Sequence, residues 1–366
     1  MLLNLEQLKS IVGQYVSTNK QAGVFTLTTA NVAELIDRIG KQFTIDTSFV
    51  DEFVEMNGEM LPLGAKIEEW YSDLVLPVDL DPTGADTLAP NDLTYRPNAY
   101  SERLGEKVIA VTERIKNLQF ACDTEEQYVA LVTMITKRLY DSLAVFTREV
   151  KKQIMGNVVA KAVDIYTNAS TFATSTAYAV NASVKKTATG KVHLVVKSIP
   201  ASNTKTFDTL LAEGFLVEMK VIKKIAKPVD TATGTAFVKE VKKDLKIASR
   251  VKEGHSLNGN LIGTCENLVM YIREGVLPVI EVDVQAGAFN GDKVMLPATV
   301  RESEDFGSAD VKYYAILCDS RALKLHMVTQ YVMDQKNAKG GFLNYFLHAD
   351  FTAFISRNAF IQIYEA

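Results

Sequence analysis

A long amphipathic stretch, residues 123–166, constrains the fold of this 366-residue chain more than any other feature. Asp123 and Glu126 have the spacing of a capping box, in which the aspartate accepts a hydrogen bond from a backbone N–H of the first turn. Apolar side chains then recur every three or four residues, which places them on one side of a helix, or of two helices in line. This stripe consists of Tyr128, Val132, Ile135, Leu139, Leu143, Phe146, Val150, Ile154, Val158, Ala162 and Ile165.

The polar positions of the same stretch are expected to face away from the stripe. They include Arg148 and Lys151, and Gly156 is expected to weaken or kink the helix. A second amphipathic helix is predicted over residues 235–251, and a shorter one over 31–39.

Runs rich in β-branched and aromatic residues surround these helices and predict strands. They are residues 107–121, 191–199, 267–272, 311–319 and 324–332. The apolar C-terminal residues are expected to complete a sheet. The segment 166–190 is rich in Thr, Ser and Ala, and we interpret it as an irregular connection or an inserted edge. The predicted fold class is α+β.

Charge divides the chain unevenly. The formal net charge of -4 argues against a dedicated nucleic-acid binder. Residues 1–100 hold 6 basic and 15 acidic side chains, and 11 of these acids lie between Asp51 and Asp92. Residues 220–252 hold 10 basic and 3 acidic side chains, a net charge of +7. The two stretches are either solvated faces or complementary surfaces through which copies of the chain meet.

Composition limits the class of protein further. The chain is 47% hydrophobic, and its three scattered cysteines, Cys122, Cys265 and Cys318, favour a globular protein made in a reducing compartment. No apolar run approaches the roughly 18 residues of a membrane span, and the first residues lack a signal-peptide core. We therefore expect a soluble protein made in the cytoplasm, with no membrane partner.

Catalytic, cofactor-binding and metal-binding motifs are missing from the sequence. Neither G-x-x-x-x-G-K-[ST] nor G-x-G-x-x-G occurs, and the histidines and cysteines lack the spacings of zinc sites. In GHSLNG (254–259), Ser256 is placed as in the nucleophile elbow G-x-S-x-G, but Asn258 stands where the elbow needs a small residue. We expect no enzyme, cofactor or metal; a serine hydrolase using Ser256 is the alternative from another class.

Phrases that follow one another along the chain carry a family resemblance. They are LPLGAKIEEWYSD (61–73), RPNAYSERL (96–104), EEQYVALVTMITKRLYDS (125–142), TAFVKEVKK (235–243), residues 266–290 and residues 311–365. In this order they resemble the extended hairpin, return strand, spine helix, later helix, strand and closing sheet of the major capsid proteins of phi29-type podoviruses. Each phrase alone has low specificity, and their common order identifies the family.

The resemblance implies the Hong Kong 97 (HK97) capsid fold. It implies an N-terminal arm with a short helix over residues 1–45, an E-loop over 46–110, a peripheral domain over 111–170 and 310–366, and an axial domain over 171–309. Residues 166–232 have no counterpart in the family, so we expect a divergent insertion, an enlarged or rebuilt loop, there. The sequence ends at Ala366, so we expect the immunoglobulin-like domain of the phi29 protein to be absent.

The resemblance also implies a function. Copies of the chain would form the pentamers and hexamers of an icosahedral virion capsid around a double-stranded DNA genome, assembled in the host cytoplasm. It implies a separate scaffolding protein, a portal at one vertex and non-specific contact with the packaged DNA. An encapsulin-like cellular nanocompartment with the same fold is the nearest alternative.

The acidic stretch would lie in the E-loop. A two-stranded hairpin is marginally stable by itself, so we expect it to lie on a neighbouring copy. Candidate contacts between copies join the carboxylates of Glu68, Glu69 and Asp73 to basic side chains of the spine helix. The basic candidates are Arg148, Lys151 and Lys152.

Overall fold

The computed structural model describes residues 49, 51–72, 95–100, 102–114, 125–260, 263–280, 299–337 and 339–366. They belong to two compact units. The first takes its described residues from 49–51, 105–148 and 327–351, and the second takes them from 52–104, 149–326 and 352–366. The predicted helix over 31–39 and the predicted cap at Asp123 lie outside the described residues.

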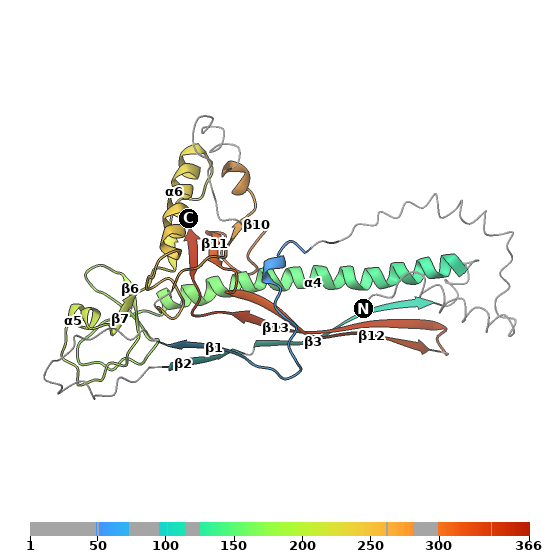
Figure 1. Ribbon diagram of the computed structural model, residues 1–366, viewed down its shortest axis with the longest axis horizontal. Coiled ribbons are helices and arrows are strands. Elements are labelled where there is room, and N and C mark those ends of the chain that lie inside the picture. Colours follow the sequence, from blue (N-terminus) through green and yellow to red (C-terminus); the bar gives the residue numbers. More distant parts are fainter. Residues whose placement is uncertain are drawn as a thin grey trace, which may run out of the picture. The chain divides into compact units, whose positions relative to one another are not determined.

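A three-stranded sheet organises the first unit. In this sheet β13 (Phe342–Ile355) lies between β12 (Leu323–Asn337) and β3 (Glu102–Arg114), as Figure 1 shows. Thr112 Oγ1 of β3 donates to Asn344 Oδ1 of β13 at 2.7 Å. The first half of α4 (Glu125–Thr167) belongs to the same unit, and the ring centroids of Phe146 and Phe351 lie 6.0 Å apart. The helix therefore packs its apolar stripe against the sheet.

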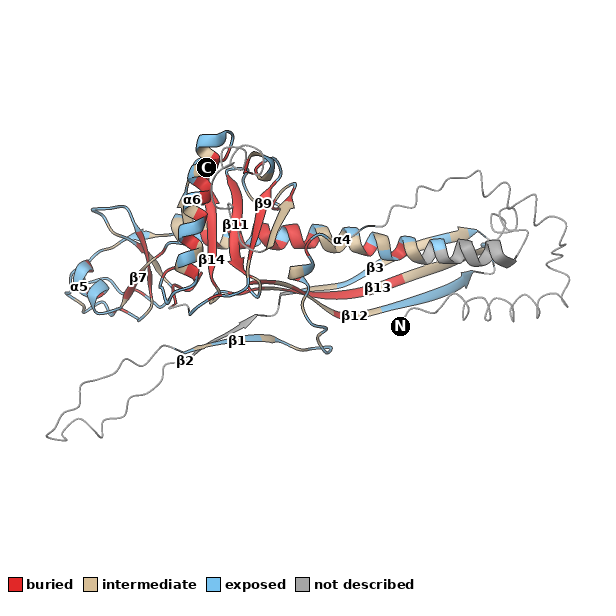
Figure 2. Cartoon of the chain, turned by 45° about the horizontal axis from the view of Figure 1, so that its top comes forward, coloured by how far each residue is buried: buried red, intermediate tan, exposed pale blue. Residues whose placement is uncertain are grey.

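The helix α4 is continuous over 43 residues, which confirms the helix predicted over 123–166. Figure 2 shows its buried stripe, in which Leu139, Leu143, Val150, Ile154, Val158 and Ala162 are buried. Beyond Val150 the buried surface widens to include Lys151, Lys152, Met155 and Val159. The expectation that Lys151 faces away from the core is wrong, because this half of the helix is covered on more than one side.

Gly156 does not interrupt α4, which continues to Thr167. A Cβ atom at Gly156 would lie 2.5 Å from the carbonyl oxygen of Phe306, closer than real contacts allow. Gly307 has a positive φ of 54°, and its own Cβ would lie 3.0 Å from Gln153 Cα. The two glycines let the backbones of α4 and the 303–309 loop cross at close range.

A five-stranded sheet forms the centre of the second unit. Its order is β10 (Thr299–Ser303), β9 (Leu268–Arg273), β11 (Tyr313–Asp319), β14 (Ile361–Glu365) and β8 (Ile222–Lys224). The two outer pairs, β10–β9 and β14–β8, are parallel, and the two inner pairs are antiparallel. Strands β11 and β14 are buried along their whole length (Figure 2), including the polar residues Asp319, Gln362 and Glu365.

The helix α6 (Thr231–Ala248) packs on this sheet and confirms the helix predicted over 235–251. It starts at a capping box, in which Asp230 Oδ1 accepts from the backbone N–H of Thr233 at 2.8 Å. Phe237 contacts Tyr364 edge to face, with ring centroids 5.3 Å apart. The buried Asp244 accepts a 2.8 Å hydrogen bond from the Tyr364 hydroxyl, so one face of α6 is fixed to the sheet.

The predicted insertion is a folded body with a core of its own. Its four-stranded sheet has the order β4 (Ser170–Thr171), β5 (Ser183–Lys185), β6 (Val192–Val195) and β7 (Leu216–Glu218), beside helix α5 (Phe207–Ala212). Its core comprises Tyr178, Val184, Val195, Ile199, Phe207, Leu210 and Leu216. Of the two interpretations of residues 166–190, the irregular connection is wrong and the inserted edge is confirmed, because β4 and β5 form one side of this sheet.

The division of the C-terminal strands also differs from the expectation. We expected residues 311–365 to form one closing sheet, but β11 and β14 pair with β8 and β9, whereas β12 and β13 pair with β3. The predicted domain boundary at 309/310 thus cuts through the five-stranded sheet. Within the described part of the chain, no helix is long and apolar enough to cross a bilayer.

Replacing Gly156 by Ala should destabilise the protein. In an open helix the change would stabilise by about 1 kcal/mol, but here the added methyl group overlaps the Phe306 carbonyl, and overpacking costs about 1–3 kcal/mol. Thermal unfolding of the full-length protein measures the effect. Gly263→Ala is the control, because its Cβ would meet no described atom within 4 Å. A Gly156→Ala protein at least as stable as the wild type would contradict the close crossing.

Candidate assembly surfaces

Cationic side chains from three elements hold residues 52–59, the segment that leads into the hairpin. Lys151 Nζ of α4 donates to the carbonyl oxygen of Phe53 at 3.0 Å. Arg301 of β10 pairs with the Glu55 carboxylate through Nε and Nη2. Lys324 Nζ of β12 donates to the carbonyl oxygen of Glu55 at 2.7 Å. We call residues 52–59 the hairpin root, and these bonds fix its backbone.

Backbone pairing and apolar burial hold the root as well. The 3₁₀ turn η1 (Val54–Met56) is followed by a parallel bridge between Asn57 and Leu325, and Gly58 N donates to Leu325 O at 2.9 Å. The side chains of Phe53 and Met56 are fully buried. A Cβ atom at Gly58 would lie 2.3 Å from the His326 ring, so the closeness of this pairing requires a glycine.

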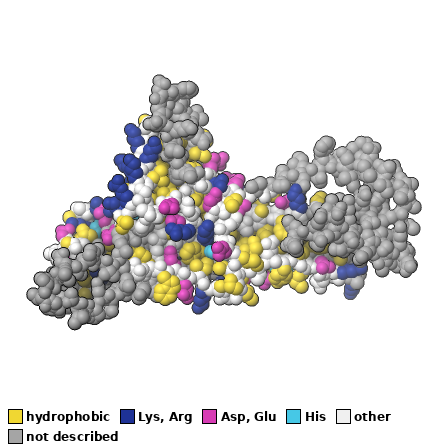
Figure 3. Space-filling model, viewed as in Figure 1, with side chains coloured by type: hydrophobic (Ala, Val, Ile, Leu, Met, Phe, Trp, Pro, Cys, Tyr) yellow, Lys and Arg dark blue, Asp and Glu magenta, His cyan; other side chains and the backbone are white. Residues whose placement is uncertain are grey.

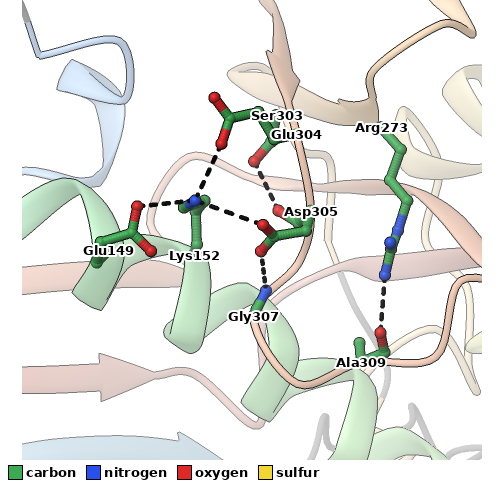
Figure 4. Close-up of polar contacts among 8 residues, drawn as sticks. All are labelled: Glu149, Lys152, Arg273, Ser303, Glu304, Asp305, Gly307 and Ala309. Carbon is green, nitrogen blue, oxygen red and sulfur yellow. Dashed lines mark hydrogen bonds and ion pairs between the residues drawn. The ribbon is translucent and has the colours of Figure 1, made fainter.

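Next to the root, Lys152 forms a compact charge cluster, drawn in Figure 4. Its Nζ lies 2.8 Å from Glu149 Oε1 and 3.4 Å from both Glu304 Oε2 and Asp305 Oδ2. Burial by itself would lower the pKa of this ammonium group. The hydrogen bond to Glu149 and the charges of Asp305 and Glu304 outweigh burial, so the pKa of Lys152 is raised. Lys152 is therefore a cation that ties α4 to the 303–309 loop.

The 303–309 loop is held from its other side by a buried arginine (Figure 4). Arg273 of β9 donates from Nη2 to Ala309 O at 2.8 Å and from Nε to Tyr313 O at 2.8 Å. Within the loop, Gly307 N donates to Asp305 Oδ1 at 2.8 Å. The loop thus links the central sheet to the spine helix through directed polar contacts.

The hairpin pairs β1 (Ile67–Ser72) antiparallel with β2 (Tyr95–Tyr100). Burial alternates along β1, as expected for a strand with one covered face. On the covered face, Glu69 accepts hydrogen bonds from the Ser356 hydroxyl and from the backbone N–H of Arg357. On the other face, which we call the outer face, Glu68, Trp70 and Ser72 are exposed, and 65% of Trp70 is accessible.

The structure separates the predicted contact residues. Glu68 is exposed on the outer face, Glu69 is bonded within its own chain, and Asp73 lies outside the described residues. Arg148 is half-buried, and Lys151 and Lys152 are buried and bonded within the chain. Contacts between copies stay a prediction. The sequence analysis did not predict the hairpin root or the charge cluster. The sequence signal for both was the pair of adjacent lysines at 151–152, beside the apolar stripe.

The chain matches one known protein family over most of its length. A family model described as "Phi29-like phage major capsid protein" matches residues 17–361. The chain belongs to this family. This match confirms the resemblance found in the sequence. It favours the phage capsid function over the encapsulin-like nanocompartment.

Solved capsid structures share the fold of this capsid protein. A chain of the Staphylococcus phage Andhra capsid superposes with a TM-score of 0.56 at 9% identity, covering 88% of this chain and 85% of that chain. A chain of the cyanophage P-SCSP1u capsid gives 0.52 at 11% identity, covering 87% and 89%. A chain from native bacteriophage P68 gives 0.56 at 10%, covering 89% and 87%. At this identity the likeness shows the fold, which is HK97-like. No curated protein sequence matches significantly.

Ser256 of the capsid protein has a structural role. It is fully buried, and its Oγ accepts a hydrogen bond from the backbone N–H of Asn260 at 2.9 Å. The ring of His255 is bonded to Gln362 instead, with Nδ1 3.2 Å from Oε1. Gly254 has a φ of 82°, and its Cβ would lie 2.0 Å from Glu218 O. This turn is shaped by a close backbone crossing, which is the physical reason for its glycine.

Metal-ligating groups are dispersed in the described part of the capsid protein. No group of three or more His, Cys, Asp or Glu side chains lies close enough to hold a metal ion there. Cys265 and Cys318 are buried thiols without a disulfide, and burial raises the pKa of Cys265 to about 11. Such a thiol is protonated and unreactive at neutral pH.

Acid should destabilise the capsid protein through His255. Burial lowers the pKa of this side chain and outweighs the hydrogen bond to Gln362, which raises it. The unfolded chain therefore binds a proton more readily, so stability is full above the unfolded pKa of about 6.5 and is lost as pH falls through the folded pKa. Thermal unfolding at pH 8, 6.5 and 5.5 should show a shallower dependence for His255→Gln than for the wild type. The difference at pH 8 isolates the packing effect of the substitution, and parallel curves would contradict the assignment.

Proposed function

We propose that copies of this capsid protein close into pentamers and hexamers through the outer face of the β1–β2 hairpin. The observation that carries the proposal is the exposed Trp70 on a hairpin whose root and covered face are already fixed. A large aromatic side chain on a two-stranded sheet gains most from being covered by another surface. In a shell, that surface belongs to the neighbouring copy.

The charged contacts follow from the same geometry. Glu68 lies beside Trp70 on the outer face, and Asp73 follows β1 in the sequence. We propose that both meet basic side chains of a neighbouring spine helix, with Arg148, Lys151 and Lys152 as the candidates. Lys151 and Lys152 would have to keep or exchange their bonds within the chain. Single exposed pairs contribute about 0–1 kcal/mol each, so their effect lies in orienting repeated contacts.

Further partners belong to the proposal as well. Assembly would use a separate scaffolding protein and a portal at one vertex, and it would take place in the host cytoplasm. The packaged double-stranded DNA would touch the shell through its phosphate backbone, which makes the contact sensitive to salt. The protein would work by assembly, with no catalytic turnover.

Electron microscopy of the full-length protein tests the assembly. The protein, produced with the scaffolding protein of the same phage, should form closed shells with five-fold vertices in negative stain. Heterologous contacts that close by rotation produce such rings and shells. Monomers or open sheets alone, with scaffold present, would overturn the proposal.

Replacing Glu68 by Lys should impair shell formation. The substitution reverses one exposed charge on the outer face and leaves the Glu69 bonds intact, so the subunit should fold normally. Shell yield is measured by sedimentation and microscopy at low and high salt. Glu253→Lys makes the same change at an exposed position outside β1, and it should assemble like the wild type. Equal yields for both variants would show that Glu68 makes no contact between copies.

A further inference from the structure

The helix α6 carries a row of exposed lysines on the side away from the central sheet. Figure 3 shows dark blue side chains along the edge of the molecule where α6 lies. The row consists of Lys239, Lys242, Lys243 and Lys246, all exposed. Together with Thr231, Ala232, Thr235, Ala236 and the acidic Glu240, these side chains line an open depression in the surface. We call the four lysines the α6 lysine row.

Most of the charge in this row is uncompensated. Lys243 pairs with Glu240, whose carboxylate also lies 3.0 Å from Lys223 Nζ. Within the part of the chain that the structure describes, Lys239, Lys242 and Lys246 form no ion pair. Three net positive charges therefore lie within two turns of the helix, without an acidic partner among the described residues.

The fold does not require these lysines. Like charges three and four residues apart on a helix repel one another. The opposite face already fixes α6 through Phe237, Val241 and the buried Asp244. A charge row that opposes helix stability and forms few ion pairs with the described residues indicates an anionic partner.

The choice of lysine favours a nucleic acid over another copy of the chain. Lysine is depleted in interfaces between proteins, whereas arginine is enriched there. A lysine ammonium is a hydrated point charge that suits phosphate without fixed geometry. From Lys239 to Lys246 the helix rises about 10 Å, which spans about three base-pair steps of 3.4 Å on one strand.

We propose that the α6 lysine row binds the phosphate backbone of double-stranded DNA without sequence preference. The inference rests on the proposed function, because the packaged genome is the DNA that the row would meet. The contact is electrostatic and made by mobile side chains, so DNA can slide along it during filling.

Binding of a fluorescent 60-base-pair duplex of random sequence to unassembled full-length protein tests the proposal. The variant Lys239→Gln/Lys242→Gln/Lys246→Gln should bind about tenfold or more weakly at 0.1 M salt. The slope of log affinity against log salt should fall by about 0.9 for each lost phosphate contact, at most about 2.7 for three. Removing like charges should leave the melting temperature unchanged or higher.

The control makes the same charge change elsewhere, as Lys185→Gln/Lys336→Gln/Lys339→Gln, at exposed positions outside α6. Equal losses in the two variants, or no loss in the α6 variant, would overturn the proposal. So would a polyglutamate peptide that binds the row under conditions where the duplex does not. Microscopy distinguishes a failure of this site from a failure of the proposed function. If the α6 variant forms normal shells and its DNA binding is unchanged, only the α6 site is refuted. If the wild-type protein forms no shells, the proposed function is refuted.

Discussion

The close crossing of α4 and the 303–309 loop is the constraint on which the rest of the second unit depends. Two glycines, Gly156 and Gly307, bring the backbones together, and Lys152 joins them by charge. The same loop carries the chain from β10 to β11, and Arg273 ties its far end to β9. A larger side chain at either glycine would move the helix away from the edge of the sheet.

The hairpin root uses the same half of α4. Lys151 is the neighbour of Lys152, and its bond to the Phe53 carbonyl sets where the chain leaves the core towards β1. Removing the ammonium from such a site leaves a buried carbonyl without a donor, which costs about 1–3 kcal/mol. The two adjacent lysines thus hold different segments, so the position of the hairpin follows from the packing of the helix.

The sequence predicted the elements whose signals are local. The apolar stripe from Leu139 to Ala162 and the amphipathic helix over 235–251 are read from neighbouring residues, and both are confirmed. The pairing of β11 with β9 and β14 depends on residues about 45 positions apart, which no local pattern specifies. The burial of Lys152 likewise depends on partners near residue 304. Periodicity carries no such information, and it placed the neighbouring Lys151 away from the buried stripe.

The bond between Glu69 and residues 356–357 has a consequence for the thermodynamics of assembly. The hairpin is already held at its root and along its covered face before another copy arrives. Its backbone loses less conformational entropy on docking than a mobile arm would lose. Weak contacts per copy are then sufficient for a stable shell, and contacts that are weak individually can break and re-form, which lets a growing lattice remove misplaced subunits.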